Sequence, residues 1–251
     1  MYVIIPARYA SSRLPGKPLA DVAGKPLIER VYDCARAAGA KHVVIATDDE
    51  RIRIAAEGFG AQVCMTSTQH ASGTDRIAEV ITLLRIAPQE IVVNLQGDEP
   101  MMPPALIRQV AETLAAHADA AVATAYHPIA TRVEFENPNV VKVVFDERGY
   151  ALYFSRAPIP WPRALMAGKS KGVLNAYRHI GIYAYRAEFV GRYAAWPPSI
   201  IEQAEQLEQL RVLARGERIV LCEAAELPGA GIDTPEDLER VRRAFEGRSQ
   251  V

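Results

Sequence analysis

Short apolar runs alternate with segments whose apolar residues recur every three or four positions through the first hundred residues of the chain. Such runs are typical of buried strands, and the helical spacing is typical of helices that cover a sheet. Helices placed between buried strands predict right-handed crossovers and a mostly parallel sheet covered on both faces. The expected strands are 2–5, 42–46, 62–65 and 90–95, and the expected helices are 27–38, 50–57 and 77–84.

The pattern changes after about residue 120, where strand-like segments follow one another more closely. A Pro-rich segment at 157–162 lies among them, and a helix is expected to return at 201–213. We find no linker, repeat or low-complexity tract. The fold class predicted is α/β: one domain over residues 1–251, a Rossmann-like, mostly parallel, doubly wound sheet, with a β-rich insertion at roughly 121–190. The later strands expected are 121–125, 140–145, 150–154, 179–185 and 218–222, with a last helix after Asp233.

The composition mainly excludes classes of protein and kinds of site. The 29 basic and 30 acidic residues give a net charge of −1, which argues against a nucleic-acid partner. No apolar run reaches the roughly 20 residues of a membrane-spanning helix, and the N-terminus lacks signal-peptide features, so we expect no membrane insertion. Cys34, Cys64 and Cys222 are widely spaced, without a C-x-x-C motif. They indicate neither a disulfide framework nor a zinc site, and favour a cytoplasmic location.

The loop at residues 6–18 carries Arg8, Arg13 and Lys17 and no acid. It follows the first expected strand, and ligands of open α/β sheets bind at the carboxyl ends of strands. Three crowded cations repel one another unless an anion offsets them, so a polyphosphate is the expected ligand. The loop is not a Walker motif, because Gly16-Lys17 is followed by Pro18. The alternative is a solvated basic loop.

Two aspartates suggest a metal site. Asp98 directly follows the strand at 90–95, within Gln-Gly-Asp-Glu-Pro, and is expected to face the basic loop. Asp233 would supply a second hard oxygen ligand, so that the two carboxylates and phosphate oxygens could hold Mg²⁺. Asp233 could instead begin a helix, because Thr234-Pro235 is a helix-start pattern. The sequence leaves both roles of Asp233 open.

The run at 4–19 resembles the signature of nucleotidyltransferases that activate acid sugars, and is most similar to the family of 3-deoxy-manno-octulosonate (Kdo) cytidylyltransferases. The run at 4–19 alone would also fit sialic-acid cytidylyltransferases. Five further segments match the Kdo family, and together they make the resemblance far more specific. The resemblance implies a fold of the nucleotide-diphospho-sugar transferase type, a homodimer and Mg²⁺ as cofactor. The other matching blocks, in the same order, are 93–100, 151–157, 178–183, 207–211 and 231–238.

The reaction that the resemblance implies is in-line attack of the anomeric hydroxyl of Kdo on the α-phosphorus of CTP, with release of pyrophosphate. Such transfer depends mostly on positioning and charge neutralisation. Asp98 and Asp233 would hold Mg²⁺, while Arg13 and Lys17 would offset charge on the leaving group and Arg8 would lie nearer the α-phosphate. The implied catalytic residues are Arg8, Arg13, Lys17 and Asp98. The implied nucleotide-binding residues are Ala7, Arg8, Ser12, Arg13, Lys17, Ser72 and Gly73.

An acidic polyol needs a cation and several hydrogen-bonding groups. The resemblance places five such residues around the sugar: Gln96, Arg156, His179, Tyr183 and Glu208. Each has a plainer explanation. His179 and Tyr183 alternate in a strand and could be ordinary half-buried residues. Glu208 could form a surface pair with Arg211 at i+3. Ser72 or Thr74 could cap the helix that follows, a role compatible with base recognition.

Two other functions remain open at this point. One is a cytidylyltransferase for a different acid sugar, such as sialic acid or an amino-substituted Kdo. The other is a non-catalytic nucleotide-binding relative that keeps only the fold. The presence of Asp98, Asp233, Arg13 and Lys17 argues against the second, since a decayed enzyme would have lost some of them.

Overall fold

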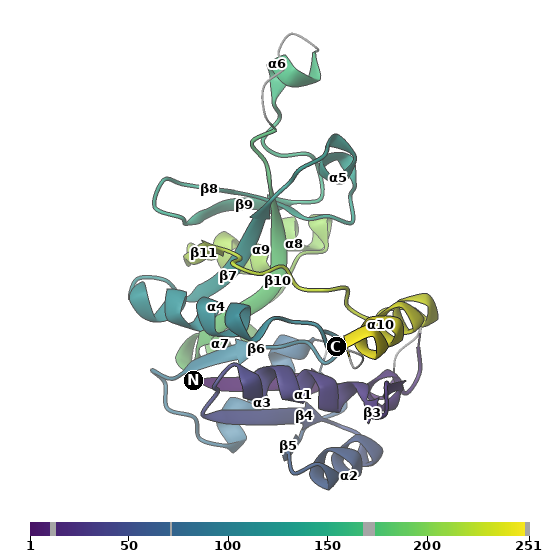
Figure 1. The fold of residues 1–251 in the computed structure, drawn as a ribbon. Helices are drawn as coiled ribbons and strands as arrows, with labels where there is room; N and C mark the ends of the chain where they lie inside the picture. The colour runs from purple at the N-terminus through teal and green to yellow at the C-terminus, as the bar shows by residue number, and fades with distance from the viewer. Residues whose placement is uncertain (11–13, 71, 168–173, 249–251) are drawn as a thin grey trace.

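The computed structural model describes residues 1–10, 14–70, 72–167 and 174–248 of the 251-residue chain (Figure 1). Its central element is a twisted sheet whose first strand is fully apolar and buried, which is why it lies in the middle. Along its main path the strands are β11 (Ile219–Glu223), β7 (Val122–Pro128), β10 (Tyr177–Arg186), β6 (Ile91–Asn94), β1 (Tyr2–Ala7), β4 (His42–Thr47) and β5 (Gln62–Met65).

The sheet is mixed and mostly parallel, which confirms the predicted fold class. β1 is parallel to β4 and β6, with Ile4 opposite Val44 on one side and Asn94 on the other. β4 with β5, and β7 with β11, are also parallel, whereas β10 is antiparallel to both of its neighbours. The carboxyl ends of β1 and β6 are therefore adjacent, and the loops that follow them meet at one edge.

Beyond the main path, β8 (Lys142–Phe145) and β9 (Ala151–Ser155) form a hairpin that extends one end of β10. Figure 1 shows this hairpin with the short helices α5 (Arg132–Glu136) and α6 (Arg163–Met166) at the top of the molecule. β7 and β10, which the sequence grouped with this segment, lie inside the central sheet.

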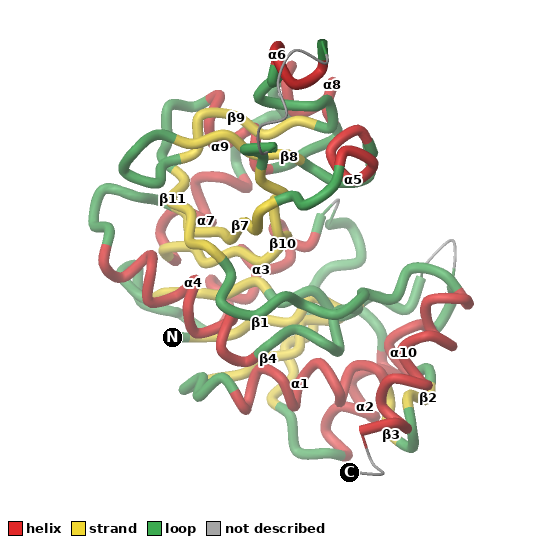
Figure 2. The backbone as a smooth tube through the Cα atoms, turned by 45° about the horizontal axis from the view of Figure 1, so that its top comes forward, coloured by secondary structure: helices red, strands yellow, loops and turns green. Residues whose placement is uncertain are grey.

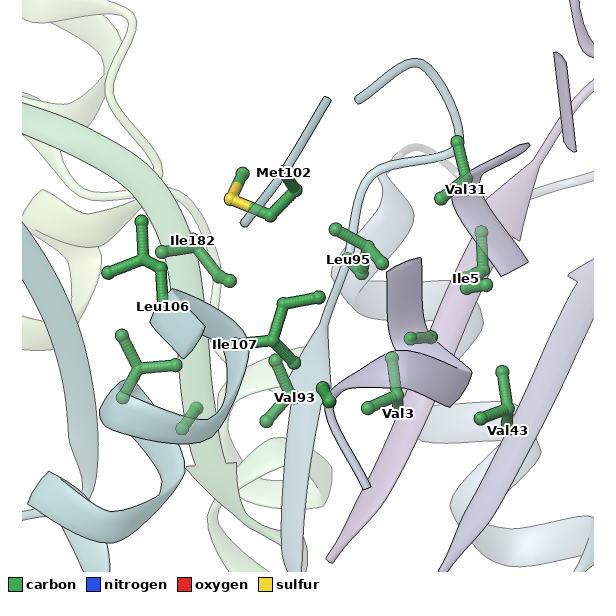
Figure 3. Packing of buried hydrophobic residues seen from close by; sticks show 14 of the residues in the cluster. Val3, Ile5, Val31, Val43, Val93, Leu95, Met102, Leu106, Ile107 and Ile182 are labelled. Carbon is green, nitrogen blue, oxygen red and sulfur yellow. The ribbon is translucent and has the colours of Figure 1, made fainter. Parts of the chain in front are cut away.

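Successive side chains of a strand point to opposite faces of the sheet, so the hydrophobic core is divided into one cluster on each face. Val3 and Ile5 contribute to one apolar cluster and Ile4 to the other. Figure 3 shows the first cluster, where Val3 and Val93 of the sheet pack with Ile107. The helices that contribute to this cluster are α1 (Leu27–Ala37), α2 (Glu50–Gly58), α4 (Pro104–Ala116) and α10 (Pro235–Arg248); those of the second are α3 (Gly73–Leu83), α7 (Ala187–Ala194) and α9 (Gln209–Ala214).

The single helix expected at 201–213 is wrong. The segment forms α8 (Ile200–Glu205) and α9, because Gln206 takes a left-handed conformation with φ of 55° and stops α8 after six residues. The interruption places Glu208 just before α9, which matters for the site described below.

The segment after β11 returns across the molecule to α10 (Figure 2). On the way it runs beside the loop after β6: Gly229 N–H donates to Met101 O at 3.2 Å, and Ile232 N–H donates to Asp98 O at 2.9 Å. Two segments more than a hundred residues apart in sequence are thereby held together. Within the described residues, no helix is both long and apolar enough to cross a membrane.

Candidate functional site

The basic loop closes on itself after β1. Gly16, with φ of 72°, donates its N–H to Tyr9 O at 3.0 Å, and Lys17 begins a short 3₁₀ helix, η1 (Lys17–Leu19). Arg8 is half-buried and its guanidinium donates to His70 O, which links this loop to the segment before α3. Residues 11–13 lie outside the described part of the chain, so the predicted positions Ser12 and Arg13 are not placed.

The two predicted carboxylates meet at one cation. Lys17 Nζ is 2.6 Å from Asp98 Oδ2 and 3.6 Å from Asp233 Oδ1, and it donates to Ile232 O at 2.7 Å. Both aspartates therefore face the basic loop across the same cleft, although 135 positions separate them in the sequence. Of the three loop cations expected from the sequence, Lys17 lies directly beside both carboxylates.

Thr234 and Asp237 form a cap at the start of α10. Asp237 Oδ2 accepts the N–H groups of Asp233 and Thr234 at 3.1 and 3.0 Å, and Thr234 Oγ1 accepts the N–H of Asp237 at 3.2 Å. This reciprocal cap fixes the start of the helix. The Asp233 carboxylate lies 3.6 Å from Lys17 Nζ.

Lys17, Asp98 and Asp233 line a cleft of about 360 Å³. Arg8 and Gln96 also line it. Asp98 and Asp233 are hard oxygen donors of the kind that Mg²⁺ prefers, and Mg²⁺ is commonly held by one or two carboxylates plus substrate phosphates. Where the structure is described, no three His, Cys, Asp or Glu side chains are arranged to hold a metal ion. The donor set therefore fits a divalent cation that arrives with a phosphate ligand.

Negative charge is concentrated beside this cleft. Burial, followed by the nearby Asp98 and Asp233 carboxylates, raises the pKa of Glu99 to about 7. Such a shift is typical of clustered carboxyl groups that lack enough positive charge. A further cation in the cleft would relieve this repulsion.

Gly97 sets the position of Asp98. A Cβ atom at Gly97 would lie 2.7 Å from Pro6 O, a main-chain atom of β1 that cannot move without moving the strand. The close approach of the two backbones is what brings the carboxylate after β6 next to the loop after β1.

We expect Gly97→Ala to lower the free energy of unfolding by about 1–3 kcal/mol, because the methyl group overpacks a rigid contact. The displacement of Asp98 should also lower kcat/KM by about 10²-fold. Urea unfolding and initial-rate assays measure the two effects. Gly191→Ala is the matched control: no atom lies within 4 Å of the added methyl group in α7, so stability should stay the same or rise. Equal behaviour of the two variants would contradict the role of Gly97.

A second cavity, of about 220 Å³, adjoins the first. It forms where β6 and β10 pair, with Asn94 directly opposite Tyr183. Gln96 lines both cavities and marks their boundary. The polar and aromatic side chains of the second cavity are Thr74, Asn94, Gln96, Tyr183, Tyr185, Tyr193, Gln206, Glu208 and Gln209.

Glu208 lines this cavity, although the residue as a whole remains exposed. Its Oε2 accepts from Thr74 Oγ1 at 3.3 Å, and burial raises the pKa of its carboxyl group. Arg211, the surface partner considered from the sequence, instead pairs with Glu202 through Nη2 and Oε1 at 2.5 Å. A carboxyl group that lines a cavity with one weak hydrogen bond is suited to bind hydroxyl groups of a ligand.

The other predicted sugar residues are placed differently. His179 lines a neighbouring cavity with Glu99, and its Nε2 is 2.9 Å from Thr124 Oγ1. Burial lowers the pKa of His179 to about 3, so its ring is neutral at pH 7. Arg156 donates from Nε to Glu205 O at 2.8 Å and contacts Gln206 O at 3.5 Å, behind the cavity wall.

The segment before α3 combines a cap with a cavity wall. Ser72 Oγ accepts from Asp75 N–H at 3.1 Å, and Asp75 Oδ2 accepts from Ser72 N–H at 3.0 Å. Ser72, not Thr74, is therefore the cap. Gly73 lies beside Pro6 and Gln96 and lines the second cavity.

Six polar or aromatic residues of the second cavity were not predicted from the sequence as site residues: Thr74, Asn94, Tyr185, Tyr193, Gln206 and Gln209. Two of them had a detectable signal, because Asn94 precedes Gln96 by two positions and Tyr185 follows Tyr183 by two, so each pair is expected on one face. Tyr193 comes from α7, and no local pattern predicts its approach to Glu208 O, to which its hydroxyl donates at 3.2 Å.

Comparison with known proteins gives a consistent result. The family model described as Cytidylyltransferase matches residues 2–219. The chain is 59% identical over 241 residues to a 3-deoxy-manno-octulosonate cytidylyltransferase of Vibrio parahaemolyticus, which covers 96% of both chains. It is 58% identical over 244 residues to a protein of the same description from Idiomarina loihiensis, again with 96% of both chains covered.

Solved structures agree with the sequence relatives. A structure described as CMP:2-keto-3-deoxy-manno-octonic acid synthetase complexed with CTP matches with a TM-score of 0.90 and 44% identity, over 98% of both chains. A nucleotidyl transferase from Methanothermobacter matches with a TM-score of 0.62 and 17% identity, also over 98% of both chains. The second similarity is one of fold alone.

Proposed function

Because the chain belongs to the family of 3-deoxy-manno-octulosonate cytidylyltransferases, we propose that its two adjoining cavities bind CTP and Kdo side by side. The reaction transfers CMP from CTP to Kdo and releases pyrophosphate. The observation that carries the assignment is the position of Gln96, which lines both the charged cleft and the tyrosine-rich cavity. An acceptor bound on one side of Gln96 can reach a phosphate bound on the other.

The charged cleft is proposed as the triphosphate site. Lys17 and Arg8 line it from the basic loop and would bind phosphate oxygens. Arg13 and Ser12, from the same loop, are proposed to complete it, as the family resemblance implies. Ala7 and the backbone around Ser72 and Gly73 would contact the nucleoside. Since the Ser72 N–H group is used within its cap, the Gly73 side of the segment is the better candidate for reading the base.

Asp98 and Asp233 are proposed to hold Mg²⁺. The support is their approach to one cationic point and the hard character of their oxygens. When bound, Mg²⁺ supplies charge neutralisation at the phosphate and lowers the pKa of the attacking hydroxyl group. The chain's own contribution is to fix the two carboxylates across the cleft, through the hydrogen bond between Ile232 N–H and Asp98 O.

The second cavity is proposed as the Kdo site. Gln96, Tyr183 and Glu208 line it and offer acceptors and donors for sugar hydroxyl groups. Arg156 would bind the sugar carboxylate after exchanging its weak 3.5 Å contact with Gln206 O, because guanidinium binds carboxylate more strongly than it binds a carbonyl group. His179, being neutral, is proposed to donate or accept a hydrogen bond rather than to supply charge.

Pyrophosphate release with a panel of substrates tests this function. We expect turnover with CTP and Kdo, and at least 10²-fold lower kcat/KM with ATP, GTP or UTP. Sialic acid and an amino-substituted Kdo are the informative alternative acceptors. Turnover with either of them but not with Kdo would overturn the assignment of the second cavity.

The segment at roughly 121–190 is proposed to serve both sugar binding and dimerisation. Leu152 on β9 and Trp161 in the Pro-rich segment are large apolar side chains, 62% and 59% exposed, near the β8–β9 hairpin. Exposed apolar groups of this kind are typical of an interface. Light scattering should give the mass of two chains, and Trp161→Glu should shift it to one. A monomeric wild-type protein would contradict this proposal.

The product, an activated acid sugar, is proposed to feed lipopolysaccharide assembly from the cytoplasm. Among the described residues, Cys64 and Cys222 are free thiols, which fits a reducing compartment. Recovery of CTP- and Kdo-dependent activity in the soluble fraction after osmotic release of the periplasm tests the location.

A further inference from the structure

The ammonium group of Lys17 occupies the point where the two aspartates converge. It is 2.6 Å from Asp98 Oδ2, 3.6 Å from Asp233 Oδ1 and 2.7 Å from Ile232 O. The Lys17 side chain is 13% exposed and Asp98 is 33% exposed, so this pair is partly buried, whereas Asp233 is 55% exposed. Three oxygen atoms from two distant segments thus surround one compact positive charge.

A divalent cation cannot share this position with the ammonium. Mg²⁺ lies about 2.0–2.1 Å from its oxygen ligands, so an ion bound to Asp98 Oδ2 would displace the ammonium from that oxygen. The ammonium is a compact, strongly hydrated point charge, so it competes for the same hard oxygens. Two cations on the same two carboxylates would also repel each other strongly.

Lys17 also lines the cleft proposed for the triphosphate. Its side chain can rotate about four bonds, so the ammonium can exchange the aspartates for a phosphate without movement of η1. A triphosphate placed in this cleft would attract it, and the carboxylates would then be exposed to the incoming metal ion.

We propose that Lys17 is an internal counter-ion that closes the divalent-metal site of the nucleotide-free protein and opens it when a triphosphate binds. This inference rests on the proposed function, because it takes Asp98 and Asp233 to be the metal ligands. It adds a sequence of events: the carboxylates accept a metal ion only with, or after, the nucleotide. The same lysine serves two anionic partners in turn.

Mn²⁺ binding without nucleotide, followed by electron paramagnetic resonance, tests the inference. We expect Lys17→Met to bind Mn²⁺ at least about tenfold more tightly than the wild-type protein, because removing an opposing cation strengthens the site. Lys17→Arg, which keeps the charge, should bind as weakly as the wild type. Arg8→Met is the matched control: it removes a cation from the same cleft, but one whose guanidinium donates to His70 O.

Asp98→Asn in the Lys17→Met background should abolish the increase in Mn²⁺ affinity. That result would show that the additional Mn²⁺ binding takes place at the carboxylates. Lys17→Gln, which keeps a donor for Ile232 O, repeats the measurement, and thermal melting confirms that each variant is folded. An equal increase in Mn²⁺ affinity in Arg8→Met would overturn the inference. So would an unchanged Mn²⁺ affinity in both Lys17→Met and Lys17→Gln. Turnover of the wild type without any divalent ion would instead overturn the metal assignment in the proposed function.

Discussion

Asp98→Asn is expected to lower kcat by about 10²–10³-fold, because it removes a charged oxygen from the point where transition-state charge must be neutralised. Asp98 is one of two carboxylates within 3.6 Å of Lys17 Nζ across the cleft. An amide is a poorer ligand for a divalent cation and leaves only Asp233 to anchor it. Initial rates of pyrophosphate release at saturating CTP and Kdo measure the effect.

The same substitution should change the free energy of unfolding by less than about 1 kcal/mol. Asp98 loses its ion pair with Lys17, but one of the charges that raise the pKa of Glu99 also disappears. Urea unfolding distinguishes lost catalysis from lost folding. Asp33→Asn on α1, which weakens an exposed ion pair with Lys25, is the control for removal of an aspartate charge. Near-normal kcat in the Asp98 variant would show that the metal assignment is wrong.

The fold could be predicted from the sequence because its strands are short, apolar and separated by helical periodicity. Ile4 illustrates why: with apolar neighbours on both sides in sequence, its strand had to be covered on both faces, and it pairs with β4 and β6. The break between α8 and α9 could not be predicted, because a non-glycine residue, Gln206, adopts a left-handed conformation there. Such a conformation costs free energy locally and is stabilised by tertiary contacts that no local pattern contains.

The site residues that lie in loops directly after strands could be predicted from the sequence. Asp98 and Gln96 come directly after β6, and the basic loop follows β1, so parallel pairing brings them together. Asp233 depends on a segment that returns across the molecule. The residues alone left its role open between metal ligand and helix start, and the resemblance to a family favoured the ligand. Tyr193 shows the remaining limit: its contact with the Glu208 main chain joins two helices through tertiary packing, which neither periodicity nor composition encodes.

One buried charge lies in α3, the helix that follows Ser72. Arg76, in the first turns of α3, is fully buried. Its Nη2 donates to Asp48 Oδ2 at 2.6 Å and its Nη1 donates to Thr66 Oγ1, while its Nε finds no partner among the described residues. The guanidinium is already one hydrogen bond short, so Asp48, 14% exposed, is the charge that compensates it.

We therefore expect Asp48→Asn to lower the free energy of unfolding by about 3 kcal/mol, because it leaves a buried arginine without an anionic partner. KM for CTP should also rise, since Arg76 holds the helix that begins at Ser72 and Gly73. Urea unfolding with an unchanged m-value measures the first effect, and initial rates measure the second. Glu57→Gln is the matched control: it breaks the ion pair with Arg53 on the surface of α2, which should cost less than about 1 kcal/mol. If both variants lose the same small amount of stability, the Arg76–Asp48 pair does not support the fold in this way.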